Sequence, residues 1–323
     1  MSRPETLLHT NQLTVGYAGS PPHVLFTNLN LVLHQGKLIC FMGPNGIGKS
    51  TLLRTLAGLH QPISGEVYYS KKNKTSPEKF LSVVLTDKPA TGFLTAEELV
   101  TFGRYPYLNW LIETTPADRE AIEQAMEITH ITGLRNRRLF ELSDGQFQLV
   151  MIARALAQAT PVMLLDEPTA HLDLNNRVEM MNLLRRIAHQ QQKAVLVATH
   201  ELDLALQTAD IIWLAGRNKD ILSGIPEDLV LSGVFDEIFR FKGFDLKTGK
   251  VEHAPWRDVT VALTGEGAAK LWTMNALERN GYRVSDEAAL HIRIINENDI
   301  LYWDLNGRIF PNLEDLLKEL TDE

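Results

Sequence analysis

The sequence lacks several features that would place it in particular classes of protein. It has one cysteine, Cys40, which excludes an intramolecular disulfide and fits a reducing compartment. It has no apolar run of about 18 residues, so no transmembrane helix is predicted. The first residues lead into polar sequence without the apolar core of a signal peptide. Internal repeats and coiled-coil heptads are absent, and the 44% of hydrophobic residues is typical of a globular protein.

Positive charge is also in short supply. The chain has 32 Lys and Arg against 40 Asp and Glu, a net charge of −8 over 323 residues. This balance argues against a nucleic-acid partner, because sequence-independent binding requires a basic surface. Residues 250–323 carry 8 basic and 14 acidic side chains, which leaves a net charge of only −2 on the rest. The shift predicts a boundary near Pro255, between a domain of residues 1–255 and a small acidic domain of residues 256–323.

Short apolar runs separated by helical segments make up most of the first 255 residues. They predict an α/β fold with a parallel sheet covered by helices on both faces. Residues 90–158 are expected to be mostly helical, with Pro116 at a helix start. The runs that predict buried strands are residues 38–42, 81–85, 162–165, 194–198 and 211–214.

The last segment has its own pattern of strands and helices. Helices are expected at residues 268–280 and 313–320, the first ending before Gly281. The alternation in residues 290–295 predicts a strand with His291 and Arg293 on its exposed face. We therefore expect a small α/β domain with a structural or regulatory role.

The first chemical motif lies between the strand at 38–42 and a helix at 52–57. It reads Gly43-Pro44-Asn45-Gly46-Ile47-Gly48-Lys49-Ser50-Thr51 and fits G-x-x-x-x-G-K-[ST]. The glycines let the backbone curl around an anion, and the N–H groups at the helix start favour phosphate. Lys49 is expected to reach the β- and γ-phosphates and Ser50 to ligate Mg²⁺. A glycine-rich turn without a ligand is the alternative.

Two carboxylates, Asp166 and Glu167, directly follow the apolar run 162–165. A carboxylate at the end of a buried strand can hold Mg²⁺ opposite a phosphate loop, and a second one can orient or deprotonate water. The alternative is a polar strand exit. A histidine, His200, ends the run 195–199; taken alone, such a residue is more often structural.

A further motif, Leu142-Ser143-Asp144-Gly145-Gln146, precedes a helix expected at residues 148–158. Taken alone, Ser143 is explained as the N-cap of that helix. In this order and spacing, however, the phosphate loop, L-S-x-G-Q, the two carboxylates and the strand-terminal histidine resemble the ATP-binding subunit of ABC transporters. The resemblance covers roughly residues 5–253. It implies a P-loop NTPase fold with a mixed sheet and a helical subdomain.

A finer resemblance comes from Gly103-Arg104-Tyr105-Pro106-Tyr107. This tract looks like the subfamily that serves ferric-siderophore, haem and vitamin B12 importers. The alternative is a helix end followed by an aromatic loop.

The family resemblance implies an ATPase whose chains pair head to tail as a homodimer around two ATP molecules. Each nucleotide would lie between one chain's phosphate loop and the other chain's L-S-x-G-Q segment. Lys49, Glu167 and His200 are the implied catalytic residues, with Glu167 as general base and His200 contacting the γ-phosphate. The implied nucleotide-binding residues are Tyr17, Asn45, Gly46, Ile47, Gly48, Lys49, Ser50, Thr51, Ser143, Gly145 and Asp173.

Two of these residues have particular implied roles. Tyr17 would stack on adenine, although an exposed tyrosine at a strand end is the alternative. Asp173 belongs to a loop that would connect the two sites. Mg²⁺ would be held by Ser50 and Asp166.

The sequence also departs from the family pattern. Where the family usually has a metal-contacting glutamine, this chain offers Thr86 or Asp87. Asp144 stands where glycine is common, and Leu149 where a basic residue is frequent.

The expected function is to power import of an iron complex, as siderophore or haem, or of cobalamin. The implied partners are integral-membrane permease subunits and, indirectly, a substrate-binding protein, at the cytoplasmic face of the inner membrane. The alternative is a soluble regulatory ABC ATPase that uses ATP-driven dimerisation as a switch without transport.

Overall fold

The computed structural model describes residues 4–70, 77–86, 92–110, 113–241, 243–246, 249–251, 254–297 and 300–322. It divides into two compact units, residues 1–240 and 241–323. The division therefore lies earlier in the chain than the boundary expected near Pro255. It places the hairpin of β11 (Phe244–Asp245) and β12 (Lys250–Val251) in the second unit. Among the described residues, no helix has the length and apolar character needed to cross a membrane.

The first unit is built on a six-stranded mixed sheet of order β10-β9-β4-β8-β7-β6. Its strands are short and apolar, and every residue of the three central strands is buried, which requires covering elements on both faces. All are parallel except β10, which runs antiparallel to β9. The strands are β4 (Leu38–Met42), β6 (Leu81–Val84), β7 (Val162–Asp166), β8 (Ala194–Ala198), β9 (Ile211–Ala215) and β10 (Ile221–Gly224).

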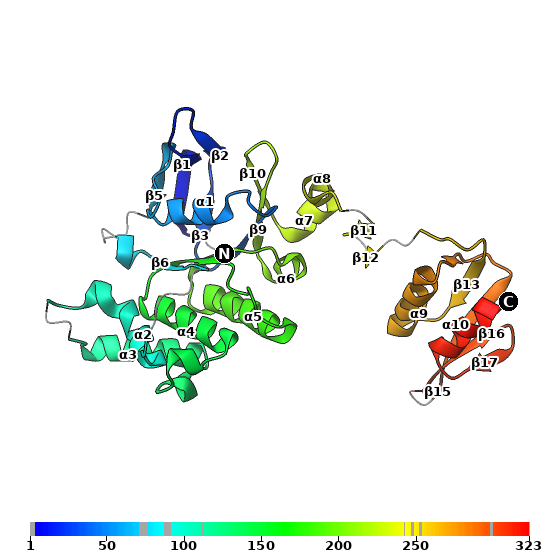
Figure 1. The fold of residues 1–323 in the computed structure, drawn as a ribbon. Helices are drawn as coiled ribbons and strands as arrows, with labels where there is room; N and C mark the ends of the chain where they lie inside the picture. The colour runs from blue at the N-terminus through cyan, green and yellow to red at the C-terminus, as the bar shows by residue number, and fades with distance from the viewer. Residues whose placement is uncertain are drawn as a thin grey trace. The chain divides into compact units, whose positions relative to one another are not determined.

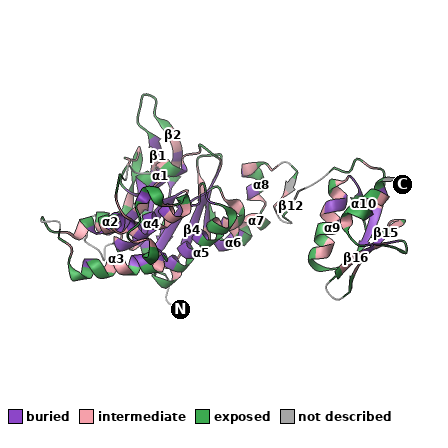
Figure 2. Cartoon of the chain, turned by 60° about the horizontal axis from the view of Figure 1, so that its bottom comes forward, coloured by how far each residue is buried: buried purple, intermediate pink, exposed green. Residues whose placement is uncertain are grey.

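Helices cover both faces of this sheet, as the sequence predicts. The helix α1 (Lys49–Leu56) lies on one face, and α4 (Asp144–Ala157) and α5 (Leu174–Gln190) lie on the other (Figure 1). Figure 2 shows buried residues concentrated in the strands and in the helix surfaces that face them. The shorter helices α6 (Leu202–Thr208), α7 (Pro226–Leu231) and α8 (Val234–Phe239) follow later in the chain.

A second, antiparallel sheet packs over α1. Its strands are β1 (Thr6–Tyr17), β2 (His23–Leu29), β3 (Val32–His34) and β5 (Ser64–Tyr69). The order is β2-β1-β3, and β5 also pairs with β1. Phe26 from this sheet packs against Phe41 of β4, and Phe41 packs against Trp213 of β9. These buried rings belong to one apolar core that also includes α1, so the phosphate-loop helix is fixed between two sheets.

Within residues 90–158 the structure places α2 (Ala96–Thr101), α3 (Pro116–Ile128) and α4, together with a 3₁₀ turn at Phe102–Tyr107. Pro116 is the first helical residue of α3, as predicted. The helix expected at residues 148–158 is present but begins at Asp144, so its predicted start was wrong, whereas the explanation of Ser143 as its N-cap is confirmed. Ser143 accepts a hydrogen bond from the Gln146 N–H, and the Gln146 side chain accepts one from the Ser143 N–H. This capping box starts the helix one turn earlier.

The second unit is a five-stranded sheet of order β14-β13-β15-β16-β17 with two helices. Trp303 donates its indole hydrogen bond to Thr273 at 2.8 Å, and the Tyr282 hydroxyl donates to the Leu320 carbonyl at 2.6 Å. Both aromatic side chains therefore bury their rings without leaving a polar group unpaired. The elements are β13 (Thr260–Thr264), α9 (Gly267–Arg279), β14 (Arg283–Val284), β15 (Leu290–Glu297), β16 (Ile300–Leu305), β17 (Arg308–Phe310) and α10 (Leu313–Asp322).

The alternation predicted for β15 is confirmed, since Ile292 is buried while His291 and Arg293 are exposed. The strand β17 was not expected. It pairs with β16 through a two-residue turn at Asn306 and Gly307, both of which have positive φ. An Asn-Gly pair is a strong hairpin signal, so the sequence did contain the information.

Gly281 supports a prediction about this unit. It follows α9 at φ +84°, and a β-carbon there would lie 2.5 Å from the indole of Trp256. Gly307 has a similar φ of +95° but open space around it. We expect Gly307→Ala to lower the free energy of unfolding by about 1 kcal/mol through backbone strain alone. Gly281→Ala should cost about 1 kcal/mol more, because Trp256 must move.

The measurement is the urea-induced unfolding of the second unit, monitored by tryptophan fluorescence. Equal losses in the two variants would show that the Trp256 contact contributes nothing.

Candidate functional site

The phosphate loop connects β4 to α1 at the carboxyl end of the central strands. Gly48 ends the loop at φ +111°, and a β-carbon there would lie 2.9 Å from Leu25, so both conformation and space require glycine. No side chain caps α1, which leaves the N–H groups of its first turn available. The N–H groups of the first helical turn and the positive end of the helix dipole together favour binding of an anion at the start of α1. Ser50 is exposed at the second position of this helix.

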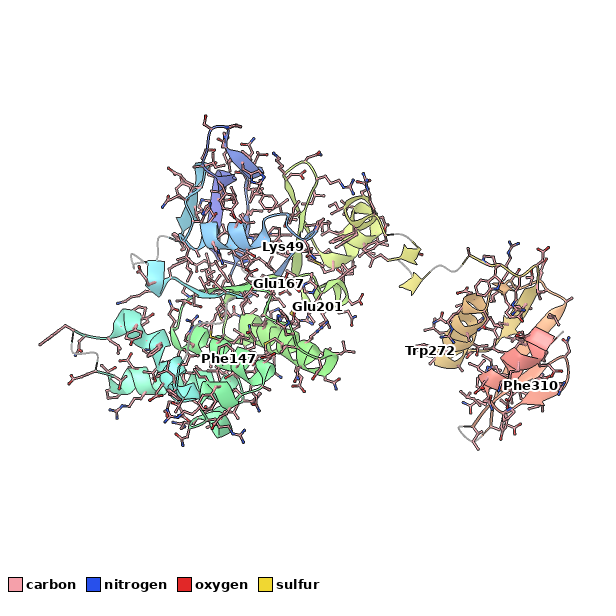
Figure 3. The ribbon with its side chains drawn as sticks, in the orientation of Figure 1. Lys49, Phe147, Glu167, Glu201, Trp272 and Phe310 are labelled. Atoms are coloured by element: carbon pink, nitrogen blue, oxygen red, sulfur yellow. The ribbon has the colours of Figure 1, made fainter. Side chains whose placement is uncertain are left out.

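Lys49 is buried and folds back along the loop. Its Nζ donates to the carbonyl oxygens of Gly43 at 3.0 Å and Pro44 at 3.4 Å. Burial lowers the pKa of Lys49 below its usual range, and the nearby Glu167 and Asp166 carboxylates oppose that shift. The ammonium group therefore feels the charge of both carboxylates, and Figure 3 shows Lys49 and Glu167 together at this edge of the sheet.

Asp166 ends β7 with an unsatisfied oxygen. Its Oδ1 is buried and has no hydrogen-bond partner among the residues that the structure describes. Leaving such an oxygen unpaired is costly, and a hard divalent cation is a ligand that would satisfy it. The Thr86 hydroxyl donates to the backbone carbonyl of Asp166 at 3.0 Å, so Thr86 lies at the same strand end. Asp87 lies outside the described residues.

The donor set therefore fits Mg²⁺ held with a nucleotide. In the described part of the chain, no three His, Cys, Asp or Glu side chains form a metal site of their own. The remaining ligands would come from a hydroxyl group, phosphate oxygens and water, which Mg²⁺ accepts readily.

Glu167 is held in an unusual backbone conformation next to Asp166. Its φ is +50°, and its N–H donates to the Ala198 carbonyl at 2.9 Å. A non-glycine residue in this region is strained and is found most often at functional sites. Its Oε2 lies 2.5 Å from Nδ1 of His200, which is half-exposed. The structure thus brings Lys49, Asp166, Glu167 and His200 to one edge of the sheet.

Tyr17 lies at the end of β1 and is 50% exposed. Its hydroxyl is 3.1 Å from the Thr51 hydroxyl in α1, and its ring is stacked with His23 at 6.3 Å. The edge of His60 contacts the ring at 5.3 Å, and His60 itself is bonded to the Gly16 carbonyl at 2.8 Å. An aromatic ring fixed beside the phosphate loop can stack on a nucleotide base. The sequence analysis did not find His60, because its hydrogen bond to Gly16 joins the segment after α1 to β1, 44 residues away in the chain.

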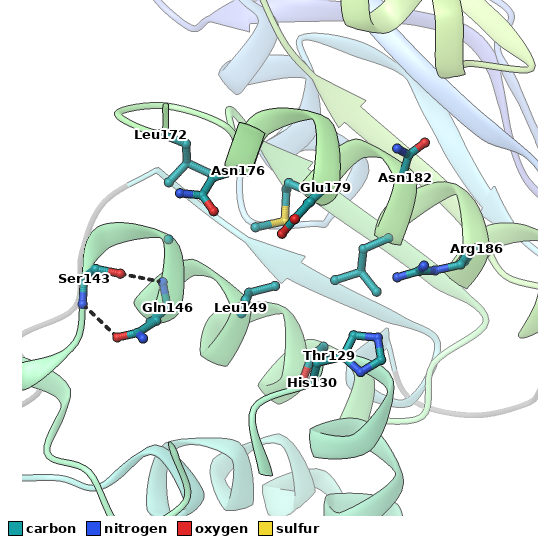
Figure 4. Close-up of a pocket in the computed structure, with 13 residues that line it drawn as sticks. Thr129, His130, Ser143, Gln146, Leu149, Leu172, Asn176, Glu179, Asn182 and Arg186 are labelled. Atoms are coloured by element: carbon teal, nitrogen blue, oxygen red, sulfur yellow. Dashed lines mark hydrogen bonds between the residues drawn. The ribbon is translucent and has the colours of Figure 1, made fainter. Parts of the chain in front are cut away.

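Ser143 and Gly145 lie in a different place. They line a groove of about 530 Å³ between α4 and α5, shown in Figure 4. A smaller cavity of about 30 Å³ is lined in part by Thr86, Asp144 and Glu167. Asp173 caps α5 by accepting hydrogen bonds from the N–H and the side-chain amide of Asn176, both at 2.9 Å.

Comparison with known proteins bears on both units. The ABC transporter family profile matches residues 26–170, and the profile of the iron ABC transporter C-terminal domain matches residues 258–321. An uncharacterized ABC transporter ATP-binding protein of Methanocaldococcus jannaschii is 35% identical over 76% of this chain and 89% of its own. The ferric enterobactin transport ATP-binding protein FepC of Escherichia coli is 34% identical over 72% of this chain and 86% of its own.

Solved structures agree with this assignment. A dimeric bacterial ABC transporter cassette is 26% identical, with a TM-score of 0.56 over 68% of this chain and 99% of that one. An inward-facing ABC transporter structure, 22% identical, matches the fold with a TM-score of 0.65 over 97% of this chain and 100% of that one. Fold and site together define a P-loop ATPase. The chain belongs to the family of ATP-binding subunits of ABC transporters, which bind and hydrolyse ATP.

The position of Tyr17 leads to a prediction. Tyr17→Ala should weaken ATP binding about tenfold, because stacking on a base contributes roughly 1–3 kcal/mol. Binding of inorganic triphosphate, which has no base, should be unchanged. Calorimetric titration with both ligands measures the difference, and Tyr68→Ala, at another exposed tyrosine of the same sheet, is the control. Equal losses for ATP and triphosphate would contradict a base-stacking role.

Proposed function

We propose that this chain hydrolyses ATP to power import of an iron complex, as siderophore or haem, or of cobalamin, through separate permease subunits. The observation that carries the ATPase chemistry is the cluster of Lys49, Asp166, Glu167 and His200 at one edge of the sheet. The cargo class is supported by the relatives. Proteins named for ferric enterobactin transport and iron(3+)-hydroxamate import are 33–34% identical to this chain. A protein named for cobalamin import is 33% identical.

The proposed reaction begins with the phosphates in the loop. The amides of residues 45–51 and the Lys49 ammonium would bind the β- and γ-phosphates, and Tyr17 would hold adenine. Mg²⁺, when bound with ATP, neutralises phosphate charge, and Ser50 and Asp166 would hold it with an oxygen from Thr86 or Asp87.

Glu167 would act next, by orienting and deprotonating the attacking water. The hydrogen bond to His200 fixes the carboxylate, and a γ-phosphate would give His200 a second acceptor. A general base must lie within hydrogen-bonding reach of its water, and this contact restricts where the carboxylate can point.

The composite site needs a second copy of the chain. Ser143 and Gly145 line a groove with α5, so in a head-to-tail homodimer they would engage the nucleotide held by the partner. Asp173 would lie in the loop between the two sites. The dimeric solved cassette supports this arrangement. We propose a peripheral location at the cytoplasmic face of the inner membrane, with a substrate-binding protein as indirect partner and no nucleic acid.

Residues 256–323 form an accessory domain in this proposal. Their net acidic charge and separate core set them apart from the cluster around Lys49. The domain is expected to be dispensable for the chemical step.

Glu167→Gln tests the general base. The amide keeps the shape of the carboxylate but cannot accept the proton, so turnover should fall at least about 100-fold while ATP affinity is retained. Steady-state hydrolysis and nucleotide titration measure the two quantities. Glu120→Gln, at an exposed position of α3 that does not line the groove, is the control and should hydrolyse ATP normally. Wild-type turnover by the Glu167→Gln protein would rule out this role for Glu167.

A mixed dimer tests the sharing of residues between chains. One chain carries Lys49→Ala and the other Ser143→Arg, so both changes fall in the same composite site and the other site stays intact. Each homodimer should be inactive, and the mixture should recover part of the wild-type activity. Hydrolysis by tagged, co-purified mixed dimers is the measurement. If activity is absent at every mixing ratio, the sites do not combine residues in this way.

A further inference from the structure

A row of polar contacts begins at Glu167 and leads away from the phosphate loop. Glu167 Oε2 lies 2.5 Å from His200 Nδ1. The other ring nitrogen, Nε2, lies 3.7 Å from Glu201 Oε1. The same Glu201 oxygen pairs with Arg177 Nη1 of α5 at 2.8 Å. The row therefore crosses from the end of β7, through the residues that follow β8, to α5.

Arg177 extends the row to the loop before α5. Its Nε donates to the Leu172 carbonyl at 2.6 Å. The buried Leu172 side chain lies against Gly145, where a β-carbon would be 3.6 Å from Leu172 Cδ2. Leu172 and Gly145 also line the groove of Figure 4. One chain of contacts thus joins Glu167 to the L-S-x-G-Q segment.

The loop between the two ends of this row is short and tied down. The Ala170 N–H donates to the Glu167 carbonyl at 3.1 Å, and the Leu172 N–H donates to the Thr169 carbonyl at 3.2 Å. Arg177 holds the far end of the loop at Leu172. A displacement of Leu172 therefore acts on a tight turn that starts at Glu167.

The ion pair at the centre of the row is partly buried. The Glu201 side chain is 15% exposed and that of Arg177 is 35% exposed. The Glu201 backbone is fixed as well, because its N–H donates to the Thr199 hydroxyl at 3.0 Å. Removing one partner of such a pair leaves the other charge poorly compensated, whereas a fully exposed pair is lost at little cost.

We propose that Glu201 and Arg177 are positioning residues for ATP hydrolysis. Their ion pair keeps His200 against Glu167 at one end and Leu172 against Gly145 at the other. When the L-S-x-G-Q segment engages the nucleotide of the partner chain, the pair transmits its position to the general base. This proposal rests on the proposed function, since it needs a hydrolytic site shared between two chains. Neither residue touches the reacting atoms.

The test uses the full-length protein with Glu201→Gln, Arg177→Gln and both changes combined. Each single variant should lower kcat about tenfold, because a small misplacement of a catalytic group has a large effect on rate. KM and the Kd for ATP should stay within about twofold of wild type. The kcat of the double variant should be no lower than that of the less active single variant. Such non-additivity is the signature of residues acting as one unit.

A matched control exists in the same unit. Arg135 and Glu97 form an ion pair at 2.7 Å with side chains 31% and 38% exposed, and Arg135 also pairs with Glu123. Glu97→Gln and Arg135→Gln should leave kcat unchanged. This control separates a specific effect on hydrolysis from a general loss of surface charge.

Conservative variants keep the test decisive if a glutamine variant fails to fold. Glu201→Asp retains the charge and should recover at least half of wild-type kcat. Arg177→Lys retains the charge but loses the planar fork that also reaches Leu172, so its kcat should fall like that of Arg177→Gln.

The results separate this proposal from the function on which it depends. A wild-type protein that hydrolyses no ATP would contradict the proposed function. If the wild-type protein is active, wild-type kcat in either single variant or additive losses in the double variant would overturn the positioning role alone. Parallel changes in kcat and the Kd for ATP would assign the pair a structural role instead.

Discussion

The geometry of this molecule depends on the convergence of three buried parallel strands at one edge of a sheet. The strands β4, β8 and β7 are neighbours, and their carboxyl ends deliver the phosphate loop, His200 and the Asp166–Glu167 pair. Because the strands are parallel, segments more than a hundred residues apart in the chain arrive at one place. The cost is a buried carboxylate oxygen on Asp166 that has no hydrogen-bond partner among the described residues.

The L-S-x-G-Q segment shows that structural and functional explanations of a residue need not compete. Ser143 completes a capping box at the start of α4, and it also lines the groove between α4 and α5. The capping hydrogen bonds fix the position of the Ser143 side chain in the groove. A side chain that caps a helix has little freedom to point elsewhere, so the Ser143 hydroxyl is held in place at the groove.

Sequence alone predicted the elements whose patterns are local. Uninterrupted apolar runs identified β4, β7, β8 and β9, and the glycine spacing identified the phosphate loop. The start of α4 was misplaced because apolar periodicity begins a turn after the capping box. The contact between Glu201 and Arg177 was not predicted, because pairing between side chains on different elements leaves no mark in their spacing along the chain. The His60 contact with Tyr17 was missed for the same reason.

The tract at residues 103–107 can now be explained by packing. A β-carbon on Gly103 would lie 2.2 Å from the carbonyl of Arg154, so only glycine fits against α4. Arg104 is buried in an ion pair with Asp118 at 2.8 Å, and its guanidinium lies 3.9 Å from the centre of the Tyr107 ring. Gly103 and Arg104 therefore fasten α3 and α4 together. The tract thus has a structural explanation within the helical subdomain, independent of the compound that is carried.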